Sequence, residues 1–203
     1  NAGTYPLTAT KSNDNYHVTF ISANYVISQA VTEVKFDLMK KEFEYTGEAV
    51  AINMSNFYVY TNRDNITAGI VYPEFATDAL GNPVEIKNVG TYTLTFKVVN
   101  DTTDLIPDNF QEAEASVTIS VLKATPTFDF TAVDQTIYRY NGAPQHITGV
   151  TSTNTDGAVV SYLNNTFVDV PDGGVLTIKV SVPETENYYP TTTTHNVTIL
   201  KAD

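Results

Sequence analysis

Apolar and polar residues alternate along almost the whole of the longest regular stretches of this chain, residues 91–99 and 113–122. The apolar positions in these stretches are Tyr92, Leu94, Phe96, Val98, Ala115, Val117, Ile119 and Val121. Because successive side chains of a β-strand point to opposite faces, this period of two predicts strands with one buried face. A slip of one residue would turn the whole apolar set to water, so the alternation also fixes the register.

Shorter segments with the same character predict strands along the rest of the chain. They cover residues 4–9, 17–20, 24–27, 33–38, 43–47, 49–54, 57–61, 84–87, 175–182 and 194–200. In the segment 33–38, Val34, Phe36 and Leu38 are predicted to face the core. Turn-forming residues separate the segments, and the abundant threonine and tyrosine favour a pleated surface. The sequence therefore predicts β structure throughout.

One phrase occurs twice almost unchanged. It reads Asn1-Ala2-Gly3-Thr4-Tyr5-Pro6-Leu7-Thr8 and again Asn88-Val89-Gly90-Thr91-Tyr92-Thr93-Leu94-Thr95, with a weaker copy at 172–179. The corresponding glycines are Gly3, Gly90 and Gly174, which lie 87 and 84 residues apart. This period is too long for a solenoid repeat and suits a β-sandwich of roughly 100 residues.

The repeat predicts an all-β fold of tandem immunoglobulin-like β-sandwich modules with a partial module at the N-terminus. Residues 1–30 are assigned to the closing strands of a truncated module, 31–123 to the first full sandwich and 124–203 to the second. The joint Lys123-Ala124-Thr125-Pro126-Thr127 should be short, extended and stiff, because proline restricts the backbone. The ending Leu200-Lys201-Ala202 copies Leu122-Lys123-Ala124, so a further module is expected to begin there.

Residues 1–30 need a partner for their apolar face. A two-stranded hairpin is marginally stable alone in water. The residues Tyr5, Leu7, Val18 and Phe20 should therefore be covered, either by the next module or by a second copy of the chain through strand exchange or dimerisation. The sequence leaves both possibilities open.

Charge excludes some classes of partner. The chain has 23 acidic and 11 basic residues and a formal net charge of −12. A surface this acidic repels phosphate backbones and anionic lipids, which argues against nucleic acid and membrane-surface binding. Cysteine is absent, so disulfides, thiolate nucleophiles and cysteine metal sites are excluded. No apolar run is long enough to span a bilayer, and any export signal or anchor is expected outside this segment.

Candidate catalytic and metal-binding residues are sparse. Asp101, Asp104 and Asp108 share one loop and could hold calcium weakly, but they lack the dense acidic spacing of a good calcium loop. The three histidines are scattered without metal-ligand spacing. No nucleophile elbow, phosphate loop or zinc motif is present. We therefore expect no cofactor and no enzymatic activity.

Tyrosine pairs are the strongest candidates for ligand contacts. Tyr58 and Tyr60 should share one strand face, and Tyr138 and Tyr140 another, while Tyr188-Tyr189 should cap a loop. Flat aromatic rings stack on sugars and anchor protein interfaces. In a sandwich such rings also fill the core or the sheet edge.

The repeated phrases resemble those of the MBG-type bacterial immunoglobulin-like repeats of large cell-surface adhesins. The resemblance rests on Gly-Thr-Tyr-x-Leu-Thr at 3–8 and 90–95, on Tyr-x-Gly at 45–47 and 140–142, and on the Asn-Tyr pairs at 15–16 and 187–188. The chain departs from it at Phe110, which replaces a loop tyrosine, and at 174–176, which lack the Thr-Tyr pair. The resemblance implies an extracellular segment on a bacterial surface without catalytic residues.

Three functions follow as hypotheses. The first is a non-catalytic adhesin stalk or spacer whose partners are the neighbouring repeat modules. The second is a binding module that holds a host glycan or protein ligand on exposed tyrosines. The third is an accessory domain of a secreted polysaccharide-degrading enzyme, which predicts a catalytic module elsewhere in the same gene.

Overall fold

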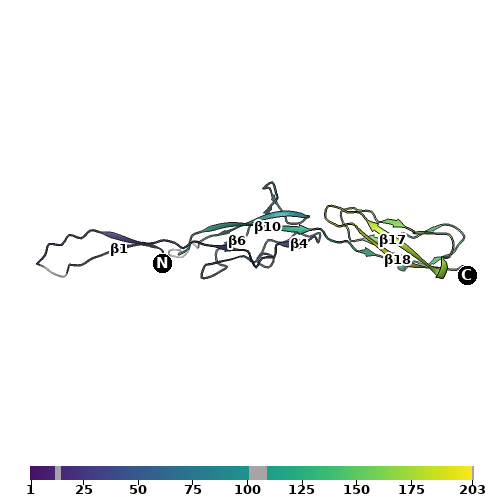
Figure 1. The fold of residues 1–203 in the computed structure, drawn as a ribbon, viewed down its shortest axis with the longest axis horizontal. Coiled ribbons are helices and arrows are strands. Elements are labelled where there is room, and N and C mark those ends of the chain that lie inside the picture. The colour runs from purple at the N-terminus through teal and green to yellow at the C-terminus, as the bar shows by residue number, and fades with distance from the viewer. Residues whose placement is uncertain (12–14, 101–108, 203) are drawn as a thin grey trace. The chain divides into compact units, whose positions relative to one another are not determined.

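The computed structural model describes residues 1–11, 15–100 and 109–202. The described part of the chain is nearly all β and contains one short helix and one 3₁₀ turn, with the strands drawn as arrows in Figure 1. By internal contacts it forms two compact units that interleave along the sequence. The first comprises residues 1–41, 50–85 and 92–119, and the second comprises residues 42–49, 86–91 and 120–203. The module boundaries at residues 30 and 123 stay a prediction.

The first unit contains the N-terminal hairpin and most of the two long strands. Its strands are β1 (Gly3–Leu7), β2 (Ala23–Ile27), β3 (Val34–Lys35), β5 (Tyr60–Thr61), β6 (Ile70–Val71), β7 (Ala76–Thr77) and β8 (Pro83–Val84), with the larger parts of β9 (Gly90–Val98) and β10 (Ala113–Leu122). β6 and β7 pair antiparallel with β9, and β8 pairs with β7. The predicted strands at 91–99 and 113–122 are therefore confirmed.

The alternation of β9 points one face into the core of the first unit. Leu94, Phe96 and Val98 are fully buried, as are Phe57 and Val59. The ring of Phe96 lies 5.3 Å from that of Tyr72 in an edge-to-face arrangement. The Tyr72 hydroxyl donates a hydrogen bond of 3.0 Å to the Phe57 carbonyl oxygen, so this aromatic ring has a satisfied polar group.

Some short predicted strands of the first unit are wrong. Residues 17–20 and 49–54 form no strand. Leu38, expected in the core, is 67% exposed. β3 ends at Lys35, and the Met39 N–H donates to the Phe36 carbonyl oxygen at 3.1 Å in a turn. The turn breaks the alternation before it reaches Leu38.

The N-terminal hairpin pairs β1 with β2 antiparallel, with Tyr5 opposite Tyr25. Its apolar side chains remain accessible, since Leu7 is 60% and Val26 is 61% exposed. Such a hairpin buries too little apolar surface to be stable by itself. What covers this face stays a prediction.

The second unit is a β-sandwich. Its elements are β4 (Glu42–Glu44), β11 (Phe128–Asp129), α1 (Thr131–Asp134), β12 (Tyr138–Arg139), β13 (Gln145–His146), β14 (Thr151–Ser152), β15 (Ser161–Leu163), β16 (Thr166–Phe167), η1 (Asp172–Gly174), β17 (Val175–Val182) and β18 (Thr191–Leu200). One sheet has the order β12-β18-β17-β15, and smaller antiparallel pairs join β13 to β16 and β11 to β14.

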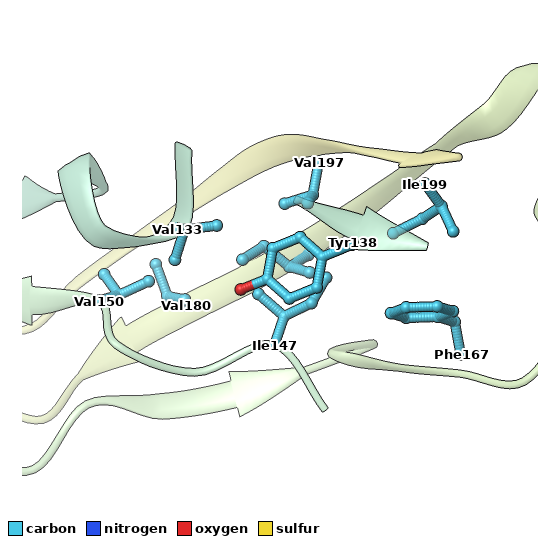
Figure 2. Close-up of a cluster of buried hydrophobic side chains, with 9 residues drawn as sticks. Val133, Tyr138, Ile147, Val150, Phe167, Val180, Val197 and Ile199 are labelled. Atoms are coloured by element: carbon cyan, nitrogen blue, oxygen red, sulfur yellow. The ribbon is translucent and has the colours of Figure 1, made fainter. Parts of the chain in front are cut away.

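The core of the second unit lies between these layers (Figure 2). The sheet contributes Ile178, Val180, Val197 and Ile199, because every second residue of β17 and β18 points the same way. Val133 from α1 and Ile147, Val150 and Phe167 close the core from the other side. The predicted all-β, immunoglobulin-like sandwich fold is confirmed.

Among the described strands, two pairs are parallel, and each joins an early strand to a closing strand. β4 pairs with β10 through Phe43 and Val121, and β12 pairs with β18 through Tyr138 and Ile199. The next residue after each pair continues the ladder: Tyr45 N–H donates to the Leu122 carbonyl oxygen and Tyr140 N–H to that of Leu200, both at 2.9 Å. The repeated Tyr-x-Gly phrase thus marks the same place in both copies.

Candidate functional site

Two alanines are held by the same backbone hydrogen bonds. In the first unit, the Ala30 N–H donates to the Asn109 carbonyl oxygen at 2.7 Å, and the Ala30 oxygen accepts from the Gln111 N–H at 2.8 Å. In the second unit, the Ala124 N–H donates to the Asn187 carbonyl oxygen at 3.0 Å, and the Ala124 oxygen accepts from the Tyr189 N–H at 2.9 Å. Each is an isolated parallel bridge, to Phe110 and to Tyr188. We call residues 109–111 and 187–189 the Asn-aromatic loops.

The asparagine side chain of each loop binds a second backbone segment. Asn109 Oδ1 accepts a hydrogen bond of 2.7 Å from the Ala2 N–H, and Asn187 Oδ1 accepts one of 2.8 Å from the Val89 N–H. Ala2 and Val89 occupy the same position of the repeated phrase. Each loop therefore ties the start of one phrase to the alanine after a closing strand. We call the two assemblies the first joint and the second joint.

Aromatic and ionic contacts support the second joint. The rings of Tyr45 and Tyr188 meet edge to face, with centroids 5.3 Å apart, and both residues are buried. Lys123 Nζ donates to Glu184 Oε1 and to the Thr185 carbonyl oxygen, each at 2.6 Å. These contacts hold the residue before Ala124 and the tyrosine of the loop.

Asp156 orders the loop that carries Asn187. Its carboxylate accepts hydrogen bonds from the Asn187 N–H at 2.8 Å and from Asn187 Nδ2 at 3.2 Å. Partial desolvation raises the pKa of Asp156, but these bonds, a Thr185 hydrogen bond and the Lys123 charge outweigh it, so the pKa lies below its ordinary value. The charged carboxylate is the form that supports the loop.

An arginine supports the first joint in place of the tyrosine pair. The guanidinium carbon of Arg63 lies 5.9 Å from the centroid of the Phe110 ring, within cation–π range. Arg63 also donates hydrogen bonds to Thr32 Oγ1, the Val99 oxygen, Asn100 Oδ1 and the Gln111 oxygen. The Thr32 hydroxyl donates a further bond to the Gln111 oxygen. One cation thus connects three segments around the loop.

The first predicted tyrosine pair is brought together. The rings of Tyr58 and Tyr60 lie 6.0 Å apart at 32°, and both residues are half-buried. The Tyr60 hydroxyl donates to the Asp37 carboxylate, 2.8 and 2.9 Å from its two oxygens. This hydrogen bond to Asp37 raises the pKa of Tyr60. The pair is a fixed aromatic surface with a polar edge.

The other predicted tyrosines separate into buried and exposed members. Tyr138 is 9% exposed and packs edge to face on Phe167, and Tyr188 packs on Tyr45. Their partners Tyr140 and Tyr189 are 37% and 49% exposed. The alternation that predicts a shared face for Tyr138 and Tyr140 ends with β12 at Arg139. Only Tyr140 and Tyr189 of these four leave substantial ring surface accessible.

The predicted calcium loop cannot be placed, because Asp101, Asp104 and Asp108 lie outside the described residues. Within the described ranges, no group of three or more histidines and carboxylates could hold a metal ion. His195 Nε2 lies 2.7 Å from Asp134 Oδ1 and its ring stacks on Phe130 at 4.1 Å, while His146 Nδ1 lies 2.9 Å from Thr166 Oγ1. His195 and His146 therefore contact neighbouring side chains of the same unit.

Four residues of the joints were assigned no role from the sequence: Asn109, Asn187, Arg63 and Asp156. The Asn-aromatic dipeptide was visible in the repeat, and so was the alanine of Leu-Lys-Ala. Their connection was not, because the paired residues of each joint are far apart in the sequence and only the folded backbone brings them together.

Comparison with known proteins adds little to this description. No family model matches the chain, and no curated protein matches it. Among solved structures, the chain is similar to the fibronectin(III)-like modules of CbhA from Clostridium thermocellum, with 14% identity and a TM-score of 0.29 over 84% of this chain and 94% of that one. A likeness at this TM-score carries no argument. Among the described residues, no helix has the length and apolar character needed to cross a membrane.

Proposed function

We propose that this chain is a non-catalytic segment of a bacterial cell-surface protein, of the MBG type, that acts as an adhesin stalk or spacer outside the cell. The observation that carries the proposal is the joint built twice with the same hydrogen bonds, on Ala30 and on Ala124. A spacer has to transmit force along the chain, and backbone hydrogen bonds that tie two distant segments of one unit resist their separation.

The parallel strand pairs support a load-bearing role. β12 enters and β18 leaves the same sandwich side by side in parallel, and β4 and the end of β10 repeat the arrangement. The hydrogen bonds of a ladder run across the strands. Tension that pulls the early strand backward and the closing strand forward loads these bonds in shear, so several must break together.

Pulling single molecules from their two ends tests this role. We expect Tyr140→Pro to lower the unfolding force, because it removes the N–H that donates to the Leu200 carbonyl oxygen. The matched control is Tyr140→Ala, which removes the ring and keeps the donor, and its unfolding force should stay near that of the parent chain. Equal forces for Tyr140→Pro and the parent chain would contradict the load-bearing role.

Ligand binding is a second candidate, favoured by the fixed pair Tyr58 and Tyr60. Their rings lie in contact and Asp37 holds one hydroxyl, so a sugar or a host protein would meet an aromatic surface with little ordering left to do. A glycan array and a host-protein array test it. Binding that is lost in Tyr58→Ala and kept in Tyr189→Ala would favour this function, and silence on both arrays would favour the spacer.

A further inference from the structure

The surface at the end of β18 repeats the half of each joint that receives an Asn-aromatic loop. Ala124 corresponds to Ala202, since Leu122-Lys123-Ala124 recurs as Leu200-Lys201-Ala202, and Ala30 corresponds to Ala124 through its hydrogen bonds. Ala2 and Val89 correspond to Gly173 in the third copy of the phrase. Tyr45 corresponds to Tyr140, because both donate their N–H to the leucine of the closing strand.

The third copy differs from the second joint in exposure. Tyr45 is 8% exposed against Tyr188, whereas Tyr140 is 37% exposed. Ala2 and Ala124 are buried and Val89 is half-buried within their joints, whereas Gly173 and Ala202 are exposed, as is Ala30 of the first joint. The apolar residue Val175 beside Gly173 is 43% exposed. The tyrosine ring and the phrase residue that the loop covers in the second joint are therefore more accessible here.

A cavity opens at the same place. Its volume is about 610 Å³, and its lining includes Pro171, Gly173, Val175, Leu200 and Lys201. Both backbone polar groups and apolar side chains line this cavity. The polar groups suit an asparagine side chain, and the apolar groups suit the aromatic ring that follows it. The Tyr188 ring and the Asn187 side chain play these two parts in the second joint.

We propose that this surface is a docking site for the Asn-aromatic loop of another immunoglobulin-like module of the same repeat, joined to the chain at Ala202. The inference rests on the proposed function as a tandem spacer and names its partner. The incoming asparagine oxygen accepts from the Gly173 N–H, and the backbone around the incoming aromatic residue bridges Ala202. The incoming ring packs edge to face on Tyr140.

Charge favours the same occupant. In the second joint, Lys123 Nζ donates to Glu184 Oε1 and to the Thr185 oxygen, three and two residues before Asn187. Lys201 takes the place of Lys123. A module whose loop carries an acidic residue at the position of Glu184 therefore gives Lys201 its ion pair, and the pair helps to set the register of docking.

Fluorescence can test the docking directly, because the chain contains no tryptophan. The test chain is extended after Ala202 by a second copy of residues 125–203, and Tyr140→Trp is placed in the first copy only. We expect the indole emission to shift to the blue and acrylamide quenching to fall at least threefold relative to the same variant without the extension. Tyr45→Trp in the unextended chain gives the reference for a docked ring.

The matched control carries Asn187→Ala and Tyr188→Ala in the added copy only, and it should return emission and quenching to the unextended values. Hydrogen exchange of peptides from residues 175–200 verifies folding, since two folded copies give a single protected mass envelope. With both copies folded, unchanged emission on extension overturns the proposal. The force measurement on Tyr140→Pro does not depend on whether a loop occupies this surface. It therefore tests the spacer function separately.

A second copy of the chain is the competing occupant. Its Asn15-Tyr16 pair could enter the surface in trans, since Tyr16 is 66% exposed. A blue shift of the unextended Tyr140→Trp chain that grows with protein concentration and disappears in Tyr16→Ala would overturn docking in cis. A concentration-independent spectrum without the extension supports it.

Discussion

The two joints share their backbone bonds and differ in the side chains that support them. Ala30 and Ala124 make the same pair of hydrogen bonds to an Asn-aromatic loop. Around the first loop, Arg63 lies over the Phe110 ring and donates to four oxygens. Around the second, Tyr45 packs on Tyr188, and Lys123 pairs with Glu184. The repeat preserves the peptide geometry while the side-chain support is exchanged.

The aromatic residue of each loop explains why the supporting side chains differ. Phe110 offers only a ring face and edge, and a guanidinium binds that face while its N–H groups reach the surrounding oxygens. Tyr188 has a hydroxyl as well, which lies 3.3 Å from Thr155 Oγ1. Its ring edge and face remain for Tyr45. A joint therefore tolerates either residue if its neighbours match, and the predictions below test the shared and the separate parts in turn.

The shared backbone bonds should give the largest and most similar effects. Ala30→Pro and Ala124→Pro each remove an N–H donor and leave a carbonyl oxygen unpaired, so we expect each to lower the free energy of unfolding by about 2–3 kcal/mol. Urea denaturation measures the loss. Ala30→Gly and Ala124→Gly keep the donor and serve as controls, with losses of about 1 kcal/mol or less. If only one of the two proline variants lost free energy of unfolding, the two joints would not be equivalent.

The support of the first joint should give the next largest effect. Arg63→Ala removes four hydrogen bonds and the contact with Phe110, and we expect a loss of about 2 kcal/mol in the free energy of unfolding. Arg63→Lys should recover little of it, because an ammonium group cannot form the planar set of bonds. Urea denaturation compares the three chains. Full recovery by lysine would show that charge alone supports the loop.

The contact between the Tyr45 and Tyr188 rings in the second joint should contribute a smaller free energy. In a double-mutant cycle of Tyr45→Ala and Tyr188→Ala, we expect a coupling free energy of about 0.5–1.5 kcal/mol, which is the usual range for edge-to-face pairs. Tyr189→Ala replaces Tyr188→Ala in the control cycle, because Tyr189 is 49% exposed. Its coupling to Tyr45 should be near zero, and equal coupling in both cycles would contradict the ring contact.

The long strands could be predicted from the sequence, because their alternating apolar residues pack into a core. Tyr92, Leu94, Phe96 and Val98 are all buried as expected. Residues 17–20 show the same alternation and form no strand. Val18 and Phe20 are 43% and 49% exposed, so the apolar stripe has no second sheet against which to pack. An alternating pattern shows which residues share one face of a possible strand. Whether the strand forms depends on another part of the protein that packs against that face.

The candidate site was less accessible to sequence reasoning. The tyrosines were found by residue type, and strand alternation then paired Tyr138 with Tyr140, which the end of β12 separates. The joints depend on hydrogen bonds such as Ala124 to Asn187, whose partners are 63 residues apart in the chain. Periodicity describes neighbours along a strand and cannot encode a loop contact of this range. The repeated alanine and asparagine become meaningful only when both joints are compared.

Acid should affect the second joint through Asp156, and this is the smallest effect we expect. The pKa of its carboxyl lies below the ordinary value of 3.8 in the folded chain, so the charged form contributes stability above pH 3.8. That contribution is lost as the pH falls through the lower folded pKa, because protonation weakens the bonds that Asp156 accepts from Asn187. Hydrogen exchange of the Tyr189 amide measures it, since this amide donates to Ala124. Asp156→Asn should exchange faster above pH 4 and lose the acid dependence, whereas the same dependence in both chains would assign it to other carboxylates.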